Sequence, residues 1–161
     1  MEAKNLKRRR IIALYAATLA GLIGWLAAIV AAPYLRSRGS AWSAFLYSCF
    51  APLCHQRPER SFRAFGQPLA VCARCTGIYL GAFLGLAVYP FRRGFSTLRL
   101  PPLAALAAVS APLAVDAAGR VLGLWDTPAV IRLATGMFWG SILPYYFMTG
   151  VGELLTAGRS K

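Results

Sequence analysis

Residues 11–32 read IIALYAATLAGLIGWLAAIVAA, an apolar run of 22 residues without a charged side chain. A helix needs about 20 apolar residues to cross the hydrocarbon core of a bilayer, so this run predicts a transmembrane helix. The preceding residues, MEAKNLKRRR, are similar to the basic start of a signal peptide. The apolar run is too long for a signal peptide, however, and no convincing cleavage site precedes Pro33. We therefore expect a first membrane span at residues 11–32.

The composition of the whole chain is that of a membrane protein. Of 161 residues, 58% are hydrophobic and only 14% are charged, whereas about a quarter of an average soluble domain is charged. The net charge of +13 would suggest a nucleic-acid partner in a soluble protein. No groove-like pattern of aromatic and basic residues accompanies that charge, and in a membrane protein the same excess faces anionic lipid head groups. We therefore exclude nucleic acid and expect membrane lipids as partners.

Further apolar runs extend the prediction to the rest of the chain. We expect an all-α, polytopic membrane protein with four transmembrane helices, forming a single membrane-embedded domain over residues 1–161. The predicted spans are residues 11–32, 72–91, 101–124 and 129–150. Pro144 is expected to kink the last of them. The segment at residues 40–74 begins with AWSAFLYSCFAPL, which is too short to span and predicts an interfacial or re-entrant helix before a loop rich in cysteine, histidine and arginine.

Glycines recur at four-residue spacing in two of the predicted spans. Gly77, Gly81 and Gly85 share one face of the second span, and Gly136 and Gly140 share one face of the last. Small residues at this spacing let helices approach closely in lipid. We expect the two glycine faces to lie close together, and such faces also offer an interface for a homo-oligomer.

Four spans place both termini on one side of the membrane. A basic run from Lys4 to Arg10 and the short basic loop RRGFSTLRL at residues 92–100 lie on that side. Lys and Arg are enriched in cytoplasmic loops, which favours cytoplasmic termini. The cysteine-rich loop and the turn near Asp126 would then be extracytoplasmic, in a multi-pass protein of the cell membrane.

The segment LCHQRPERSFRAFGQPLAVCARCTGIY, residues 53–79, carries three of the four cysteines and the only histidine of the chain. Zinc in structural sites takes four thiolate or imidazole ligands, and a C-x-x-C pair with a second ligand pair across a loop fits this requirement. The candidate ligands are Cys54, His55, Cys72 and Cys75. We therefore predict a Cys3His zinc site, with Cys49 as a spare thiol.

Other functions compete with metal binding. A C-x-x-C pair at a helix amino terminus, next to Arg74, also suits a thiol–disulfide oxidoreductase that passes electrons to a quinone-type carrier. Four spans with two intramembrane charges would suit an ion or small-solute transporter. The simplest alternative is that the thiol pair only fills space in packing and that His55 is a structural or proton-handling residue.

Arginines crowd the same segment. The candidate ligand-binding residues are Gln56, Arg57, Arg60, Arg63 and Arg74. Planar guanidinium groups suit phosphate oxygens, and only Glu59 offsets their charge locally. We predict a pocket for an anionic membrane-associated ligand, such as a lipid phosphate, beside the metal. The alternative is that each arginine merely reaches toward lipid phosphates at the interface.

Two charged residues interrupt predicted spans, where charge is costly and usually functional or paired. At helical rise, Asp116 lies about 15 Å and Arg132 about 9 Å from the turn near Asp126, so the two side chains could meet. Arg120 is a competing partner for Asp116, one turn away on the same face. Such a pair would either lock two helices together or assist ligand or proton handling. The candidate catalytic residues are Asp116, His55 and Arg132, and the sequence leaves open whether the protein is an enzyme.

The motifs CHQRPERSF and LAVCARCTGIYLG, followed by an aspartate and an R-x-x-x-G-x-x-x-G pattern, resemble the small prokaryotic integral membrane proteins grouped as domain of unknown function 2085. The matching residues are Cys54, His55, Gln56, Pro58, Arg60, Ser61, Cys72, Arg74, Cys75, Gly77, Tyr79, Gly81, Asp116, Arg132, Gly136 and Gly140. Cys49 falls outside the pattern, which disfavours a mechanism that needs two disulfides. At Ala117 the chain departs from the glycine expected directly after the aspartate. The resemblance implies a membrane protein and supports the site, and it implies no substrate.

Overall fold

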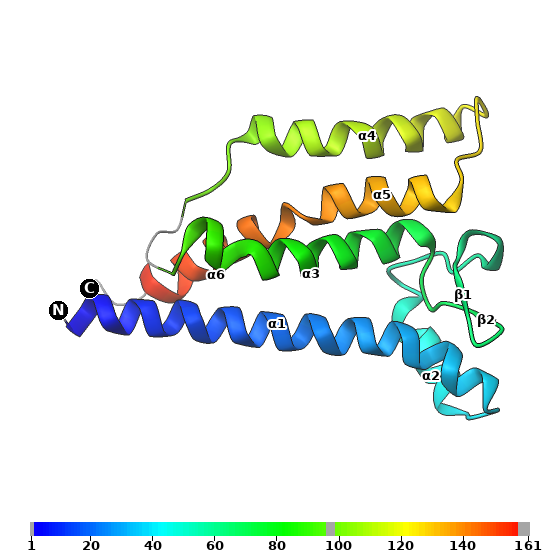
Figure 1. Ribbon diagram of the computed structural model, residues 1–161, viewed down its shortest axis with the longest axis horizontal. Helices are drawn as coiled ribbons and strands as arrows, with labels where there is room; N and C mark the ends of the chain where they lie inside the picture. Colours follow the sequence, from blue (N-terminus) through cyan, green and yellow to red (C-terminus); the bar gives the residue numbers. More distant parts are fainter. Residues whose placement is uncertain (1, 96–98, 158–161) are drawn as a thin grey trace.

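The computed structural model describes residues 2–95 and 99–157, and the chain is mostly helical (Figure 1). The helices are α1 (Glu2–Ser37), α2 (Trp42–Phe50), α3 (Ala73–Arg93), α4 (Leu103–Val121), α5 (Ala129–Gly140) and α6 (Leu143–Ala157). Between α2 and α3 lie the short 3₁₀ helix η1 (Pro58–Arg60) and the strands β1 (Arg63–Ala64) and β2 (Gln67–Pro68). The helices α1, α3, α4 and α5 run lengthwise, and the cysteine-rich loop and the α4–α5 turn lie at the same end (Figure 1).

Two helices in the described part of the chain are long and apolar enough to cross a membrane. They are Asn5–Ser37 within α1 and the whole of α4. The 36 residues of α1 extend for about 54 Å, beyond both ends of the apolar run that predicted it. Pro33 lies inside α1 rather than at its end. The expected helical membrane protein is thus confirmed in outline, with two candidate spans.

The last predicted span, residues 129–150, is two helices rather than one kinked helix. Helix α5 ends at Gly140 and α6 begins at Leu143. Pro144 has no backbone N–H, and in a continuous helix its ring would clash with the carbonyl of Gly140. The chain turns just before the proline instead. With 12 and 15 residues, neither α5 nor α6 is long enough to cross a bilayer alone.

Helices α3 and α5 pack backbone to backbone at their glycines. A Cβ atom on Gly81 would lie 2.0 Å from the backbone oxygen of Met137, and one on Gly85 would lie 2.2 Å from that of Ser141. Gly140 is equally close to the backbone of α3. Gly81 contacts Met137, and Gly85, four residues later, contacts Ser141, which is also four residues later. The helices are therefore parallel, and both begin at the cysteine-rich end. The predicted contact between the two glycine faces is confirmed within one chain.

The cysteine-rich loop contains a β-hairpin that the sequence analysis missed. Strands β1 and β2 pair antiparallel, with Ala64 opposite Gln67. Phe65 and Gly66 between them have positive φ angles of 54° and 75°, as a type I′ turn requires. Strands of two residues show no alternation of polar and apolar side chains, so only the glycine could have signalled the turn. Arg63, a predicted ligand-binding residue, is exposed on β1.

A hydrophobic cluster attaches the cysteine-rich loop to the helices. Its buried members include Ile29 of α1, Phe50 of α2 and Val71 just before α3. Cys54 and Cys72 belong to the same cluster. The backbone that carries the cysteines is therefore held by core packing rather than hanging free in a loop.

Candidate metal centre

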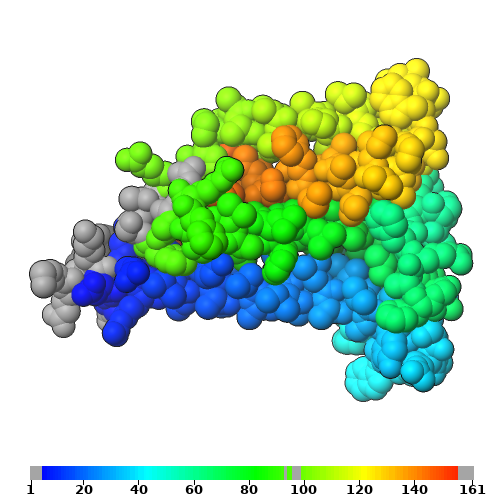
Figure 2. Space-filling view, viewed as in Figure 1, coloured from blue at the N-terminus to red at the C-terminus, as the bar shows by residue number. Residues whose placement is uncertain are grey.

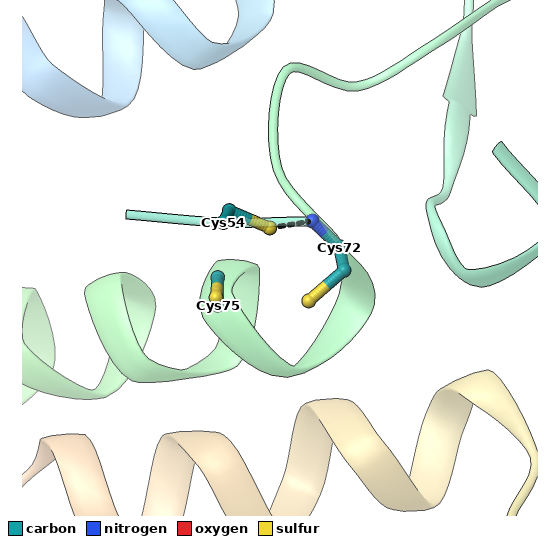
Figure 3. A group of neighbouring side chains, drawn as sticks. All are labelled: Cys54, Cys72 and Cys75. Atoms are coloured by element: carbon teal, nitrogen blue, oxygen red, sulfur yellow. Dashed lines mark hydrogen bonds between the residues drawn. The ribbon is translucent and has the colours of Figure 1, made fainter. Parts of the chain in front are cut away.

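Three of the four cysteines form a cluster at the start of α3. The sulfur atoms of Cys54, Cys72 and Cys75 all lie within 4.8 Å of one another. Cys54 and Cys72 are buried, and Cys75 is half-buried. Figure 3 shows Cys72 and Cys75 on the first turn of α3, with Cys54 reaching them from a separate segment. The fold thus brings together thiols from two distant parts of the sequence.

The start of α3 explains why these thiols meet. Cys72 is the N-cap residue, with extended backbone angles of φ −68° and ψ 163°, and Cys75 follows three residues later on the same turn. The backbone N–H of Cys72 donates a hydrogen bond to Sγ of Cys54 at 3.1 Å (Figure 3). An N–H donor and a helix amino terminus both favour the thiolate, which is the metal-binding form of cysteine.

Gln56 braces the segment that carries Cys54. Its side-chain nitrogen donates hydrogen bonds to the carbonyl oxygens of Tyr47 at 2.7 Å and of Ala70 at 2.8 Å. These bonds tie α2 to the segment that leads into α3. The backbone of Gln56 has a φ of 48°, a left-handed conformation that is costly for a residue with a side chain. Gln56 was predicted to bind a ligand, but the structure uses its amide nitrogen to hold the cysteine loop.

The cluster suits a soft metal ion. Zinc binds cysteine sulfur at about 2.3 Å, which places tetrahedral ligand sulfurs about 3.8 Å apart. Sulfur atoms within 4.8 Å of one another reach this spacing by small side-chain rotations. Thiolates favour zinc, copper(I) or iron–sulfur clusters over calcium or magnesium. The three cysteines could therefore hold a metal, and the donor set alone leaves the identity of the metal open.

His55 lies outside this cluster, although the sequence placed it among four ligands. Its side chain is exposed, and its Nδ1 atom accepts a hydrogen bond from the backbone N–H of Arg57 at 3.1 Å. In the neutral ring the proton then sits on Nε2, so neither nitrogen has a free lone pair for a metal. In this conformation the cluster of candidate ligands consists of the three cysteines. Cys49 is exposed on α2 and also lies outside the cluster.

The aspartate of α4 pairs with Arg74 rather than with Arg132. Arg74 donates to Oδ2 of Asp116, and the hydroxyl of Thr127 donates to Oδ1 of the same carboxylate. Asp116 is buried, and its carboxylate joins α3, α4 and the α4–α5 turn. The predicted Asp116–Arg132 pair is therefore wrong, because α3 lies parallel to α5 and presents its own arginine to the carboxylate.

Arg132 pairs instead with the aspartate of the α4–α5 turn. Its guanidinium lies 2.6 Å from the carboxylate of Asp126, and that of Arg120 lies 3.6 Å from the same group. The side chain of Arg132 is only 7% exposed, whereas Asp126 is 79% exposed. Arg120, which was predicted as a competing partner for Asp116, thus also pairs with Asp126 of the turn.

Arg60 of the loop lies near the charged residues of this turn. The pKa of Arg60 lies below its ordinary value, first because its side chain is partly desolvated and then because Arg120, Arg57 and Arg132 bring positive charge near it. Figure 2 shows the loop after α2 beside the α4–α5 turn at one end of the molecule. The sequence analysis placed Arg57 and Arg60 in an anion pocket but missed Arg120 as a neighbour, because only the tertiary packing brings the turn to the loop.

A mostly helical chain with candidate membrane spans and a three-cysteine cluster at one end defines a membrane protein with a possible metal site. The chain belongs to the family described as "Predicted membrane protein (DUF2085)", which matches residues 54–146. The predicted family resemblance is confirmed. The matched region begins at Cys54 and includes Cys72 and Cys75, whereas Cys49 lies outside it.

Two archaeal proteins are similar to this chain. "Uncharacterized protein MJ1492" of Methanocaldococcus jannaschii is 34% identical over 125 residues, which cover 76% of this chain and 80% of the relative. An "Uncharacterized protein" of Methanothermobacter thermautotrophicus is 38% identical over 91 residues, which cover 55% of this chain and 78% of the relative. No solved structure matches the chain significantly.

Proposed function

We propose that this protein is a multi-pass protein of the cell membrane in which Cys54, Cys72 and Cys75 bind a zinc ion beside arginines that bind an anionic, membrane-associated ligand. The observation that carries the proposal is the convergence of three thiols within 4.8 Å from two segments of the chain. The hydrogen bond from the Cys72 N–H to the Cys54 sulfur adds support, because it stabilises a thiolate.

In the proposed arrangement, α1, α3, α4 and the α5–α6 pair each cross the bilayer. The 21 residues of α3 extend for about 32 Å, close to the thickness of the hydrocarbon core. The basic start of the chain favours cytoplasmic termini and an extracytoplasmic cysteine cluster. A homo-oligomer would need a surface other than the glycine faces of α3 and α5, because those faces already contact each other within one chain.

Zinc is proposed because three thiolates suit it and because it needs no redox partner. Zinc commonly takes four ligands, so three cysteines leave one position for water or for a ligand atom. His55 could take that position only by giving up its hydrogen bond from Arg57. Arg57 and Arg60 would supply the charge-assisted contacts to an anion held beside the metal.

Metal analysis of the purified full-length protein tests this proposal. We expect about one zinc ion per chain and thiols that react with a thiol reagent faster after chelation. Cys72→Ser should abolish zinc binding, because it removes one of three ligands. Cys49→Ser is the matched control, because Cys49 is an exposed thiol outside the cluster, and it should leave zinc binding unchanged. Protein that binds no zinc even when zinc is supplied would refute the proposal.

A second candidate is thiol oxidation by a quinone-type carrier, and an apolar groove favours it. The groove lies between α1, α3 and α6, has a volume of about 380 Å³ and is lined in part by Trp25 and Tyr79. Tyr79 lies one turn along α3 from Cys75. Two clustered thiols would form a disulfide and release two protons and two electrons, and the quinone would take up both and become a quinol. Protein isolated without zinc and with a disulfide within the cluster would support this function instead.

A further inference from the structure

We propose that the paired amino termini of α3 and α5 form a binding site for the phosphate group of a lipid phosphomonoester, whose chain lies in a groove between α4 and α5. The inference rests on the anion-binding part of the proposed function and names the class of its ligand. It is independent of whether the cysteines hold a metal.

Two helix amino termini meet at one place. Helices α3 and α5 are parallel, and a Cβ atom on Gly77 would lie 2.1 Å from the backbone oxygen of Leu133, so their first turns are neighbours. Neither helix has a side-chain hydrogen bond at its N-cap residue, which is Cys72 in α3 and Pro128 in α5. The positive ends of two helix dipoles therefore face the same end of the molecule, where the N–H of Cys72 already donates to the sulfur of Cys54. Phosphate groups bind at such ends.

Two guanidinium groups at these termini, each already paired with an aspartate, have a buried Nε donor without an acceptor. The Nε atoms of Arg74 and Arg132 are both buried, and neither has a hydrogen-bond partner within residues 2–95 and 99–157. Arg132 is 6% exposed, so its Nε atom is shielded from bulk water. The charges of both arginines act on the carboxylate of Asp116, which places them at the same site. Buried donors are almost always satisfied in native proteins, and a phosphate oxygen is a suitable acceptor for both.

The charge of this site matches a dianion. Five arginines and three carboxylates gather here, which leaves a net charge of +2. The arginines are Arg57, Arg60, Arg74, Arg120 and Arg132, and the carboxylates are Glu59, Asp116 and Asp126. A phosphomonoester carries a charge of about −1.5 to −2 at pH 7, whereas a phosphodiester carries a single negative charge. Both aspartates are already paired with arginines, so their repulsion of a ligand is reduced.

A groove between α4 and α5 has room for the lipid chain. It has a volume of about 690 Å³ and is lined mainly by apolar side chains, among them Pro112, Val115 and Ile131. Asp116 lines the same groove and accepts the hydrogen bond from Arg74. Pro128, the N-cap residue of α5, lines the groove beside Asp126 and Thr127, so a phosphate at the α5 terminus would sit at the polar end of the groove. This arrangement suits an amphiphile rather than free phosphate.

The test is the binding of short-chain phosphatidic acid to the full-length protein in detergent, measured by titration calorimetry. Short-chain phosphatidylglycerol, a phosphodiester with the same chains, and inorganic phosphate are the comparison ligands. We expect phosphatidic acid to bind at least about tenfold more tightly than either. Equal affinity for the two lipids would overturn the phosphomonoester site. Inorganic phosphate that binds as tightly as phosphatidic acid would overturn the role of the groove.

Three variants locate the site. Arg132→Lys keeps a positive charge beside Asp126 but removes Nε, and we expect about tenfold weaker binding of phosphatidic acid. The side chain of Ile131 is 50% exposed, so Ile131→Trp would fill the groove. It should weaken the binding of phosphatidic acid by about tenfold without changing the binding of phosphate. Arg38→Lys is the control, because Arg38 is exposed and lies over the ring of Tyr34 at 5.5 Å. It should bind phosphatidic acid like the unaltered protein.

Zinc content, measured on the same samples, separates this inference from the metal site. Zinc retained without selectivity for phosphatidic acid would overturn the lipid site alone. Selectivity for phosphatidic acid without zinc would support the lipid site and refute the metal. Unaltered lipid binding by both Arg132→Lys and Ile131→Trp would overturn the assignment to these helix termini.

Discussion

Replacing Gly81 with alanine tests the close packing on which both sites are built. A Cβ atom on Gly81 would lie 2.0 Å from the backbone oxygen of Met137 and 2.8 Å from its carbonyl carbon. Ordinary van der Waals contact begins at 3.4 Å, so α3 and α5 would have to separate by about 1.4 Å, the difference between the two distances. The contacted atoms belong to helix backbone, which cannot rotate away as a side chain can.

This separation should lower both stability and metal affinity. Overpacking a close contact costs about 1–3 kcal/mol, and a clash with backbone places Gly81→Ala near the upper end. For a chain of this size, a loss of about 3 kcal/mol lowers Tm by about 6–12 °C. Because α3 carries Cys72 and Cys75 on its first turn, a shifted α3 should also weaken zinc binding.

Thermal unfolding followed by circular dichroism in one detergent is the assay. Gly24→Ala is the matched control, because Gly24 lies in α1 and nothing lies within 4 Å of its Cβ position. Alanine is favoured over glycine inside a helix by about 0.5–1 kcal/mol, so this control should leave Tm unchanged or raise it. Equal Tm values for Gly81→Ala and Gly24→Ala would refute the backbone-to-backbone contact.

Three further predictions concern the site. Cys54→Ser should abolish zinc binding, whereas His55→Ala should retain it. Metal analysis of the two variants checks this, and loss of zinc from both would contradict the three-cysteine set. Asp116→Asn should destabilise the protein by about 3 kcal/mol, because it leaves Arg74 without its carboxylate. A double-mutant cycle with Arg74→Gln should show a coupling energy, and strict additivity would argue against the pair. Gln56→Leu should lower Tm by about 4–8 °C through the loss of two hydrogen bonds; an unchanged Tm would rule out its bracing role.

The helical framework could largely be predicted from local sequence. The apolar run at residues 11–32 is long enough to cross a bilayer, so its helix needs no knowledge of its neighbours. The C-x-x-C spacing indicated that Cys72 and Cys75 share one turn, because that follows from the geometry of any helix. The glycines at four-residue spacing indicated a close helix contact for the same reason.

The partners of the charged residues could not be predicted in this way. Distances counted from the α4–α5 turn suggested a pair between Asp116 and Arg132, yet the structure pairs Asp116 with Arg74 and Arg132 with Asp126. Counting residues gives depth along a helix axis but not the direction from which another helix approaches. Proximity in sequence likewise did not indicate that the ring of His55 accepts a hydrogen bond within the loop, because that bond depends on a turn in the backbone.

The sequence by itself therefore determined a helical membrane protein with a thiol-rich loop and two glycine faces. Only the tertiary structure decided that α3 and α5 run parallel in contact, that Cys54 joins the first turn of α3, and that Arg60 lies near the arginines at the α4–α5 turn. The physical reason is that apolar length and helical period act within one segment. Ligand sets and ion pairs arise between segments, and their geometry exists only after the helices have packed.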